Sequence, residues 1–265
     1  MVVMNESFSD LTTYLEGYET STDPMPYVRS LMKHGDVVSG TCAVSSDMGT
    51  GTANSEFEFL TGNSMVYFKG NTTYVQFIDT ETPSLASLLA DRGYSTMAMH
   101  AYERAGYNRV KVYDRFDFET VDEPTVVLFF GDHEPRLSNE FYSSWFTDEN
   151  DLDLETTAQL HKTPFFIWGN YSLNAESIQK GSVVSLNYLS TVLFQTAGVQ
   201  LSPYQEYLAD LRMEHPVITA RYFTTAFGDK VGTAPSAFTD SIREYQWLQY
   251  NCVFDRAHRI PGFYS

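Results

Sequence analysis

Residues 49–60 read GTGTANSEFEFL, a glycine-spaced turn that runs into a predicted helix. Glycines on either side of Thr50 let the backbone approach a ligand closely. Thr52 then lies where backbone N–H groups and the positive end of the helix would meet an anion. This arrangement is typical of a nucleophile that acts on a phosphate group, and the alternative is that Thr52 only caps the helix.

The composition predicts a globular protein with one large domain, or one domain with a small appendage. The chain has 265 residues, of which 43% are hydrophobic and 15% aromatic, enough to bury a full core. No run approaches the roughly 20 apolar residues of a membrane span, and the first residues lack the features of a signal peptide. We therefore expect this chain, as given, to be soluble.

The charge of the chain limits its partners. A formal net charge of −17 argues against binding of nucleic acid, and against binding of an anionic bilayer, through a general positive field. An anionic substrate would have to be held locally, by a metal ion or by a few arginines. Cys42 and Cys252 are too few to form a disulfide framework and match no metal or redox motif.

Polar side chains follow two predicted strands. Residues 1–4 read as a short buried strand followed by Glu6, and residues 124–130 read as a strand buried on both faces. Asp132 and His133 follow the second strand, and a carboxylate with an imidazole suits Zn²⁺ or Mn²⁺. Ligands of open α/β sheets bind at the carboxyl ends of the strands. The alternative is a polar turn in which Asp132 caps the next helix.

The remaining pattern predicts an α/β protein. We expect further strands at 94–99 and 163–168, the first ending at His100, and helices at 23–35, 83–93, 149–160, 185–198 and 204–212. His100 at a strand end is more often structural, and Arg109 could equally form a surface ion pair. From Pro216 onward aromatic and β-branched residues dominate. We expect a catalytic domain over 1–200 and a small C-terminal subdomain over 201–265.

Several tracts resemble one known family, the sulfatase-like phosphoglycerol transferases, or lipoteichoic acid synthase family, of the alkaline phosphatase superfamily. Three motifs carry the resemblance: MNESFSD at 4–10, GTANSEFEFLTG at 51–62 and GDH at 131–133. The tracts 163–171, 187–198 and 245–255 also look like the C-terminal half of that family. The resemblance covers nearly the whole chain and implies a three-layer α/β sandwich with a mostly parallel central sheet.

The resemblance also implies a set of site residues. One divalent metal, usually Mn²⁺ with Mg²⁺ or Zn²⁺ as alternatives, would be held by Glu6, Asp132, His133 and the oxygen of the nucleophile Thr52. Three substrate-binding residues are also implied: Arg109 would grip the phosphate, and His100 and Tyr107 would line the glycerol-phosphate pocket.

The implied activity is transfer of glycerol phosphate from a phosphatidylglycerol-type lipid, through a phosphothreonine intermediate, to a polyol or glycolipid acceptor. In the family this takes place at the extracytoplasmic face of a bacterial cell membrane, and here any membrane contact would need segments absent from this chain. The alternatives are a sulfatase or phosphoethanolamine transferase, or a truncated homologue that binds metal but is catalytically impaired. Thr52 disfavours a sulfatase, because threonine cannot be oxidised to the formylglycine that sulfatases use.

Two departures from the family pattern stand out. The chain starts inside the first strand, without the membrane helices that such proteins carry ahead of the catalytic domain. The join at 118–124 is short, whereas the family has a long segment with a substrate-contacting histidine there. We therefore expect this chain to bind metal but to turn over slowly.

Overall fold

The computed structural model describes most of the chain in a series of ranges. These are residues 1–15, 17–35, 37–45, 51–68, 73–76, 78–98, 116, 126–135, 138, 153–169, 172–179 and 181–265. Within these ranges, none of the helices combines the length and the apolar character needed to cross a bilayer.

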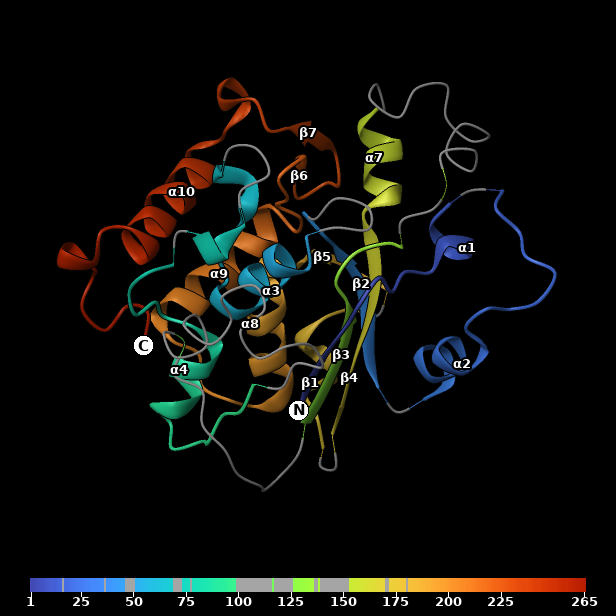
Figure 1. Ribbon diagram of the computed structural model, residues 1–265, viewed down its shortest axis with the longest axis horizontal. Coiled ribbons are helices and arrows are strands. Elements are labelled where there is room, and N and C mark those ends of the chain that lie inside the picture. Colours follow the sequence, from blue (N-terminus) through green and yellow to red (C-terminus); the bar gives the residue numbers. More distant parts are fainter. Residues whose placement is uncertain are drawn as a thin grey trace.

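A five-stranded sheet forms the middle layer of the fold (Figure 1). Its strands, in spatial order, are β1 (Val2–Asn5), β3 (Val126–Gly131), β4 (Lys162–Gly169), β2 (Val38–Ala43) and β5 (Val183–Ser185). Strand β1 pairs parallel with β3, and β2 pairs parallel with β5, whereas β4 is antiparallel to both of its neighbours. Four of these five strands therefore run the same way, which confirms the predicted mostly parallel sheet.

Helices cover both faces of the sheet. In Figure 1, α3 (Thr52–Thr61), α4 (Leu85–Ala90), α8 (Leu186–Ala197), α9 (Pro203–Glu214) and α10 (Asp240–Val253) lie on one side. On the other side lie α1 (Leu11–Tyr14) and α2 (Pro26–His34), with α7 (Leu154–Leu160) leading into β4. Helix α3 packs on α8, which in turn packs on β2, β4 and β5. The predicted three-layer α/β sandwich is thus confirmed.

The burial of the two predicted site strands is less complete than expected. Strand β1 lies at the edge of the sheet, so Val2 remains 39% exposed. In β3, Leu128 and Phe130 are buried, but Phe129 faces the side with fewer helices and is only half-buried. The ring of Phe129 stacks on Phe166 at 5.1 Å.

One strand prediction is wrong and one strand was missed. Residues 94–98 form no strand, and Tyr94 and Met97 are 53% and 59% exposed, because this segment has no neighbour in the sheet. Strand β2 went unpredicted because its sequence, VSGTCA, lacks the large apolar residues of a buried strand. Its pairing with β4 and β5 holds it in the sheet instead.

The predicted helices are present, with shorter bounds in several places. Helix α2 matches its prediction, but none of its residues is buried and Tyr27 is 77% exposed. Helix α4 begins after a capping box formed by Ser84 and Ser87. Helix α8 ends at Gly198, whose φ of 73° is the left-handed conformation that favours glycine.

The C-terminal segment shares its core with the rest of the protein. It contains α9, the hairpin of β6 (Tyr222–Thr224) and β7 (Lys230–Gly232), and α10. Its apolar residues Phe223 and Leu248 belong to the same buried cluster as Phe57. Tyr245 donates a hydrogen bond of 2.6 Å to the carbonyl of Gly62, which ends α3. The division at residue 200 stays a prediction.

A buried carboxyl group ties α3 to the segments on either side of it. Glu58 is 0% exposed, and its Oε1 accepts hydrogen bonds from Ser45 Oγ (2.6 Å), Ser64 Oγ (3.1 Å) and Met65 N (2.8 Å). Burial raises the pKa of Glu58 to about 7, against this network of donors. Ser45 Oγ also accepts from Ala220 N at 3.0 Å, so the network reaches the C-terminal segment.

Glu58→Gln should flatten the pH dependence of stability. The pKa of Glu58 is about 7 in the folded state and near 4.5 in the unfolded chain, so the folded state holds a proton that the unfolded state has lost between these values. Stability therefore falls as pH rises through this window. We expect the free energy of unfolding of the parent to drop by roughly 2 kcal/mol more than that of the variant between about pH 5 and pH 8.

Urea unfolding at the two pH values makes the comparison, with the exposed Glu244→Gln as the matched control. In the control, the free energy of unfolding should change with pH as it does in the parent. An equal change with pH in Glu58→Gln and in the parent would contradict the role given to this carboxyl group.

Candidate functional site

The pairing of β1 with β3 brings two carboxylates to one edge of the sheet. Asn5 lies opposite Gly131 in the parallel register, so Glu6 and Asp132 leave the sheet side by side. Asp132 N donates to Asn5 O at 3.3 Å, and Ser7 N donates to Asp132 Oδ1 at 2.8 Å. The turn after β1 therefore holds the Asp132 side chain in place.

This turn passes directly over Gly131. A Cβ atom at this position would lie 1.9 Å from the carbonyl oxygen of Phe8, so only glycine fits. Ser7 has a φ of 53°, in the left-handed region that residues with a side chain rarely adopt. Local strain beside a cluster of carboxylates is a common feature of functional sites.

Thr52 is the first residue of α3, and its hydroxyl faces the carboxylates. The preceding Gly51 has a φ of 97° and occupies the N-cap position. Thr52 Oγ1 donates to Glu6 Oε2 at 2.9 Å and lies 3.2 Å from His133 Nε2. Ser55 Oγ donates to Asp132 O at 2.7 Å, which fixes the first turn of α3 against the end of β3. In this geometry the Thr52 hydroxyl does not cap the helix.

His133 is fully buried and presents one nitrogen to the cluster. Its Nδ1 lies 2.8 Å from the carbonyl oxygen of Glu134, a contact that places the proton on Nδ1. Its Nε2 lies 3.2 Å from Glu6 Oε1 and 3.1 Å from Asp132 Oδ2. Nε2 is therefore free to act as a metal ligand.

The donor set fits a divalent cation. The ligand atoms of Glu6, Asp132 and His133 all lie within 4.8 Å of one another. Asp132 Oδ2 is buried and has no hydrogen-bond donor among the described residues. Burial raises the pKa of Asp132, and the Glu6 carboxylate raises it further, while His133 acts in the opposite direction. Two carboxylates, a hydroxyl and an imidazole suit Mn²⁺, Zn²⁺ or Mg²⁺.

The structure thus brings Glu6, Thr52, Asp132 and His133 together. The capping alternative for Asp132 does not apply, because Oδ1 accepts from His133 N at 2.9 Å and no helix follows in the described residues up to 135. The other three predicted site residues, His100, Tyr107 and Arg109, lie outside the described residues.

Two residues near the site were not predicted. Glu134 is 1% exposed, and neither of its carboxylate oxygens has a hydrogen-bond partner in the described part of the chain. Thr163, at the start of β4, donates from Oγ1 to Gly131 O at 2.8 Å. The sequence predicts a strand at 163–168 but gives no direction for it, and the antiparallel pairing of β4 with β3 is what brings Thr163 beside Gly131.

Comparison with known proteins identifies relatives of this chain. A family model described as Sulfatase matches residues 1–122. A protein of Rhizobium meliloti (strain 1021) described as a putative cyclic beta-1,2-glucan modification protein is 38% identical over 369 aligned residues, which cover 100% of this chain and 56% of the relative. The chain therefore spans little more than half the length of that relative.

Two solved structures share the fold. The Streptococcus pyogenes phosphoglycerol transferase GacH, in complex with sn-glycerol-1-phosphate, matches 99% of this chain and 88% of its own, with a TM-score of 0.62 at 14% identity. The Listeria monocytogenes lipoteichoic acid synthase LtaP matches 95% of this chain and 92% of its own, with a TM-score of 0.57 at 12% identity. At such low identity, these likenesses concern the fold alone.

The alignment with the Rhizobium relative is longer than this chain. It spans 369 positions against 265 residues, so at least 104 of its positions (369 − 265) have no residue in this chain. The Sulfatase match ends at residue 122, inside the short join that the sequence predicts at 118–124.

Gly131→Ala should damage both folding and the site. The added methyl group would collide with the Phe8 carbonyl, so either the turn after β1 or the end of β3 must move. We expect a loss of at least about 2 kcal/mol of stability, measured by thermal or urea unfolding, and weaker Mn²⁺ binding by calorimetry. Gly232→Ala is the matched control, since nothing lies within 4 Å of a Cβ atom placed there. A Gly131→Ala protein as stable as the control would contradict this packing.

Proposed function

We propose that the chain is a metal-dependent phosphoglycerol transferase of the sulfatase-like alkaline phosphatase superfamily, with Thr52 as its nucleophile. The observation that carries the proposal is the position of the Thr52 hydroxyl at the start of α3, between Glu6 Oε2 at 2.9 Å and His133 Nε2 at 3.2 Å. A hydroxyl so placed can accept a phosphoryl group, and the positive end of the helix favours the negative charge that develops.

In the first step, Thr52 Oγ1 attacks the phosphorus of a phosphatidylglycerol-type lipid. The new Thr52–O–P bond replaces the bond to the diacylglycerol oxygen, which leaves as a hydroxyl with the proton that Thr52 gave up. In the second step an acceptor hydroxyl attacks the phosphothreonine, and its proton returns to Thr52. In the resting state, the Thr52 hydroxyl donates a hydrogen bond to Glu6. This contact orients the hydroxyl so that the lone pairs of Thr52 Oγ1 face the substrate.

Metal and substrate would be held by separate groups of residues. Glu6, Asp132, His133 and Thr52 would hold the divalent ion, proposed to be Mn²⁺, which when bound would lower the hydroxyl pKa and offset phosphate charge. Arg109 would grip the phosphate with a planar, permanently charged fork, as lysine cannot. His100 and Tyr107 would line the glycerol-phosphate pocket.

The proposed acceptor is a polyol, either a glucan or a glycolipid. GacH was solved with sn-glycerol-1-phosphate, and the Rhizobium relative is described as modifying a cyclic β-1,2-glucan. Transfer of phosphoglycerol to a glucan hydroxyl is consistent with both the ligand of GacH and the description of the Rhizobium relative. The reaction would take place at the extracytoplasmic face of a bacterial cell membrane, where lipid donor and glycan acceptor meet.

A phosphothreonine adduct is the expected outcome of incubation with donor lipid alone. The chain, loaded with Mn²⁺ and given phosphatidylglycerol, should gain the mass of one phosphoglycerol group, located on Thr52 by peptide mapping. Thr52→Ala should gain nothing, whereas Thr225→Ala, on the turn between β6 and β7, should react like the parent. Phosphatidylethanolamine and a sulfate ester serve as competing donors. An adduct from either of these alone, or an adduct on another residue, would contradict the proposal.

The short join at 118–124 should slow turnover without abolishing metal binding. The proposed ligands all lie outside that join, but the histidine that the family carries in this segment would be missing. Loss of one general acid or base typically costs ~10²- to 10⁴-fold in rate. The measurement compares turnover of a fluorescent phosphatidylglycerol analogue by this chain and by one with a family-type segment restored between Thr120 and Val121, each with Mn²⁺. Equal rates would show that the missing histidine is dispensable.

A further inference from the structure

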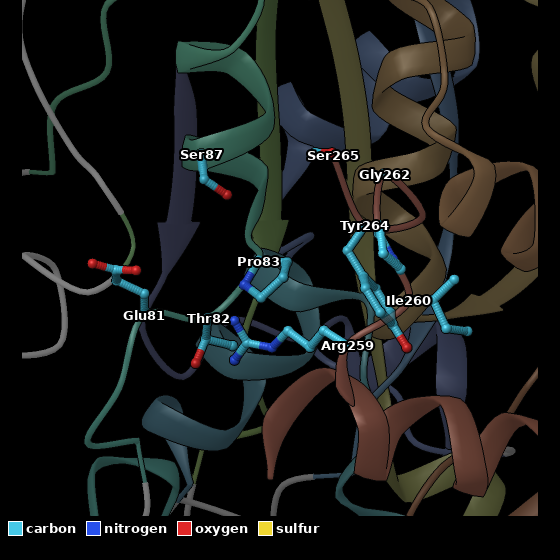
Figure 2. A pocket seen from close by; sticks show the side chains of 10 residues that line it. Glu81, Thr82, Pro83, Ser87, Arg259, Ile260, Gly262, Tyr264 and Ser265 are labelled. Carbon is cyan, nitrogen blue, oxygen red and sulfur yellow. The ribbon is translucent and has the colours of Figure 1, made fainter. Parts of the chain in front are cut away.

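A hollow of 490 Å³ lies where the segment before α4 meets the C-terminal segment (Figure 2). Its walls include Glu81, Thr82, Pro83, Arg259, Ile260 and Pro261. None of these residues belongs to the candidate site around Thr52. The volume is within the range of small-molecule sites, about 300–1,000 Å³.

The guanidinium group of Arg259 lies at this hollow, and its hydrogen-bonding capacity is only partly used. Its Nε donates to the carbonyl oxygen of Cys252 at 2.8 Å, but its Nη2 is buried and has no hydrogen-bond partner among the described residues. Figure 2 shows the guanidinium group directed towards Thr82 and Pro83. Burial lowers the pKa of Arg259, as expected for a cation that lacks an adequate counter-ion. A buried charged donor without an acceptor is costly, and an anionic ligand would remove that cost.

The Glu81 side chain at the hollow forms an ion pair with a neighbouring arginine and none with Arg259. Arg256 Nη2 pairs with Glu81 Oε2 at 3.1 Å, and the same carboxylate raises the pKa of Arg259, against the larger effect of burial. An anion bound at Arg259 would supply the acceptor that the buried Nη2 lacks among the described residues.

The other walls point to a ligand that is more than a bare anion. Thr82 Oγ1 donates to Thr80 O at 3.1 Å, so its remaining lone pairs can accept from a ligand hydroxyl. Pro83, Ile260 and Pro261 supply apolar surface that suits a short carbon chain. We propose that the hollow is a second ligand site, in which Arg259 binds the phosphate of a phosphorylated polyol, free in solution or as a lipid head group. The site stands on these contacts and does not rest on the proposed transfer reaction.

Binding of inorganic phosphate and of sn-glycerol-1-phosphate to metal-free Thr52→Ala protein tests the proposal, with calorimetry or NMR titration as the readout. Arg259→Gln should weaken binding of both at least about tenfold, because it removes a charge-assisted hydrogen bond. Arg243→Gln is the matched control and should bind as the parent does, because Arg243 is an exposed arginine of α10 that pairs with Asp240. In an Arg109→Gln background, which removes phosphate binding at the proposed active site, the binding that depends on Arg259 should persist, so failure of one site is distinguishable from failure of the other.

Glu81→Gln gives a change in the opposite direction. It removes the one acidic side chain among the residues that line the hollow, and that side chain is 71% exposed, so folding should be unaffected. We expect phosphate to bind severalfold more tightly. This outcome does not depend on the folding of Arg259→Gln.

Vesicles distinguish the source of the phosphate. Loss of binding to phosphatidylglycerol vesicles, compared with phosphatidylcholine vesicles, in Arg259→Gln would support a lipid head group. Loss of binding to the soluble esters alone would support a free phosphorylated polyol. The proposal is overturned if Arg259→Gln binds all three phosphate sources like the parent, or if the parent binds none of them at millimolar concentration.

Discussion

The crowding of two carboxylates at one edge of the sheet is the constraint on which the site depends. Glu6 and Asp132 offer ligand atoms within 4.8 Å of each other and of His133, and no described lysine or arginine forms an ion pair with either carboxylate. Like charges so close, one of them buried, repel strongly at low dielectric constant. A cation or a proton would remove that repulsion, and in the proposed function the cation is the divalent metal ion, held beside the Thr52 hydroxyl.

Backbone geometry, more than side-chain packing, holds these groups in place. The strained turn at Ser7 passes over Gly131 because no side chain intervenes, and its N–H fixes the Asp132 carboxylate. The Ser55 hydroxyl joins the first turn of α3 to Asp132 O, while Glu58 anchors the last turns of that helix to the loops beside it. The proposed nucleophile, Thr52, is therefore carried on a helix that is restrained at both ends, which would limit the reorganisation needed during reaction.

The sequence revealed the parts of the site that follow a strand or open a helix, because apolar runs and glycines mark those positions directly. It failed where tertiary pairing decides the structure. Strand β2 is weakly apolar and depends on its neighbours, and the reversed direction of β4 placed Thr163 beside Gly131 without any local signal. The expected strand at 94–99 shows the converse error, since residues 94–98 have strand-like composition but no pairing partner. Arg259 was overlooked because a single arginine in a turn has no pattern that announces a buried nitrogen.

Anomalous diffraction from crystals soaked in Mn²⁺ tests the central claim most directly. The account predicts one manganese peak, with Glu6, Asp132, His133 and Thr52 Oγ1 as its protein ligands, at about 2.0–2.2 Å by analogy with zinc–oxygen and zinc–nitrogen bonds. A nucleophile activated by the ion must coordinate it, so the Thr52 oxygen is the decisive ligand. A peak more than about 6 Å from Thr52 Oγ1, or no peak at the Asp132–His133 pair, would contradict the account.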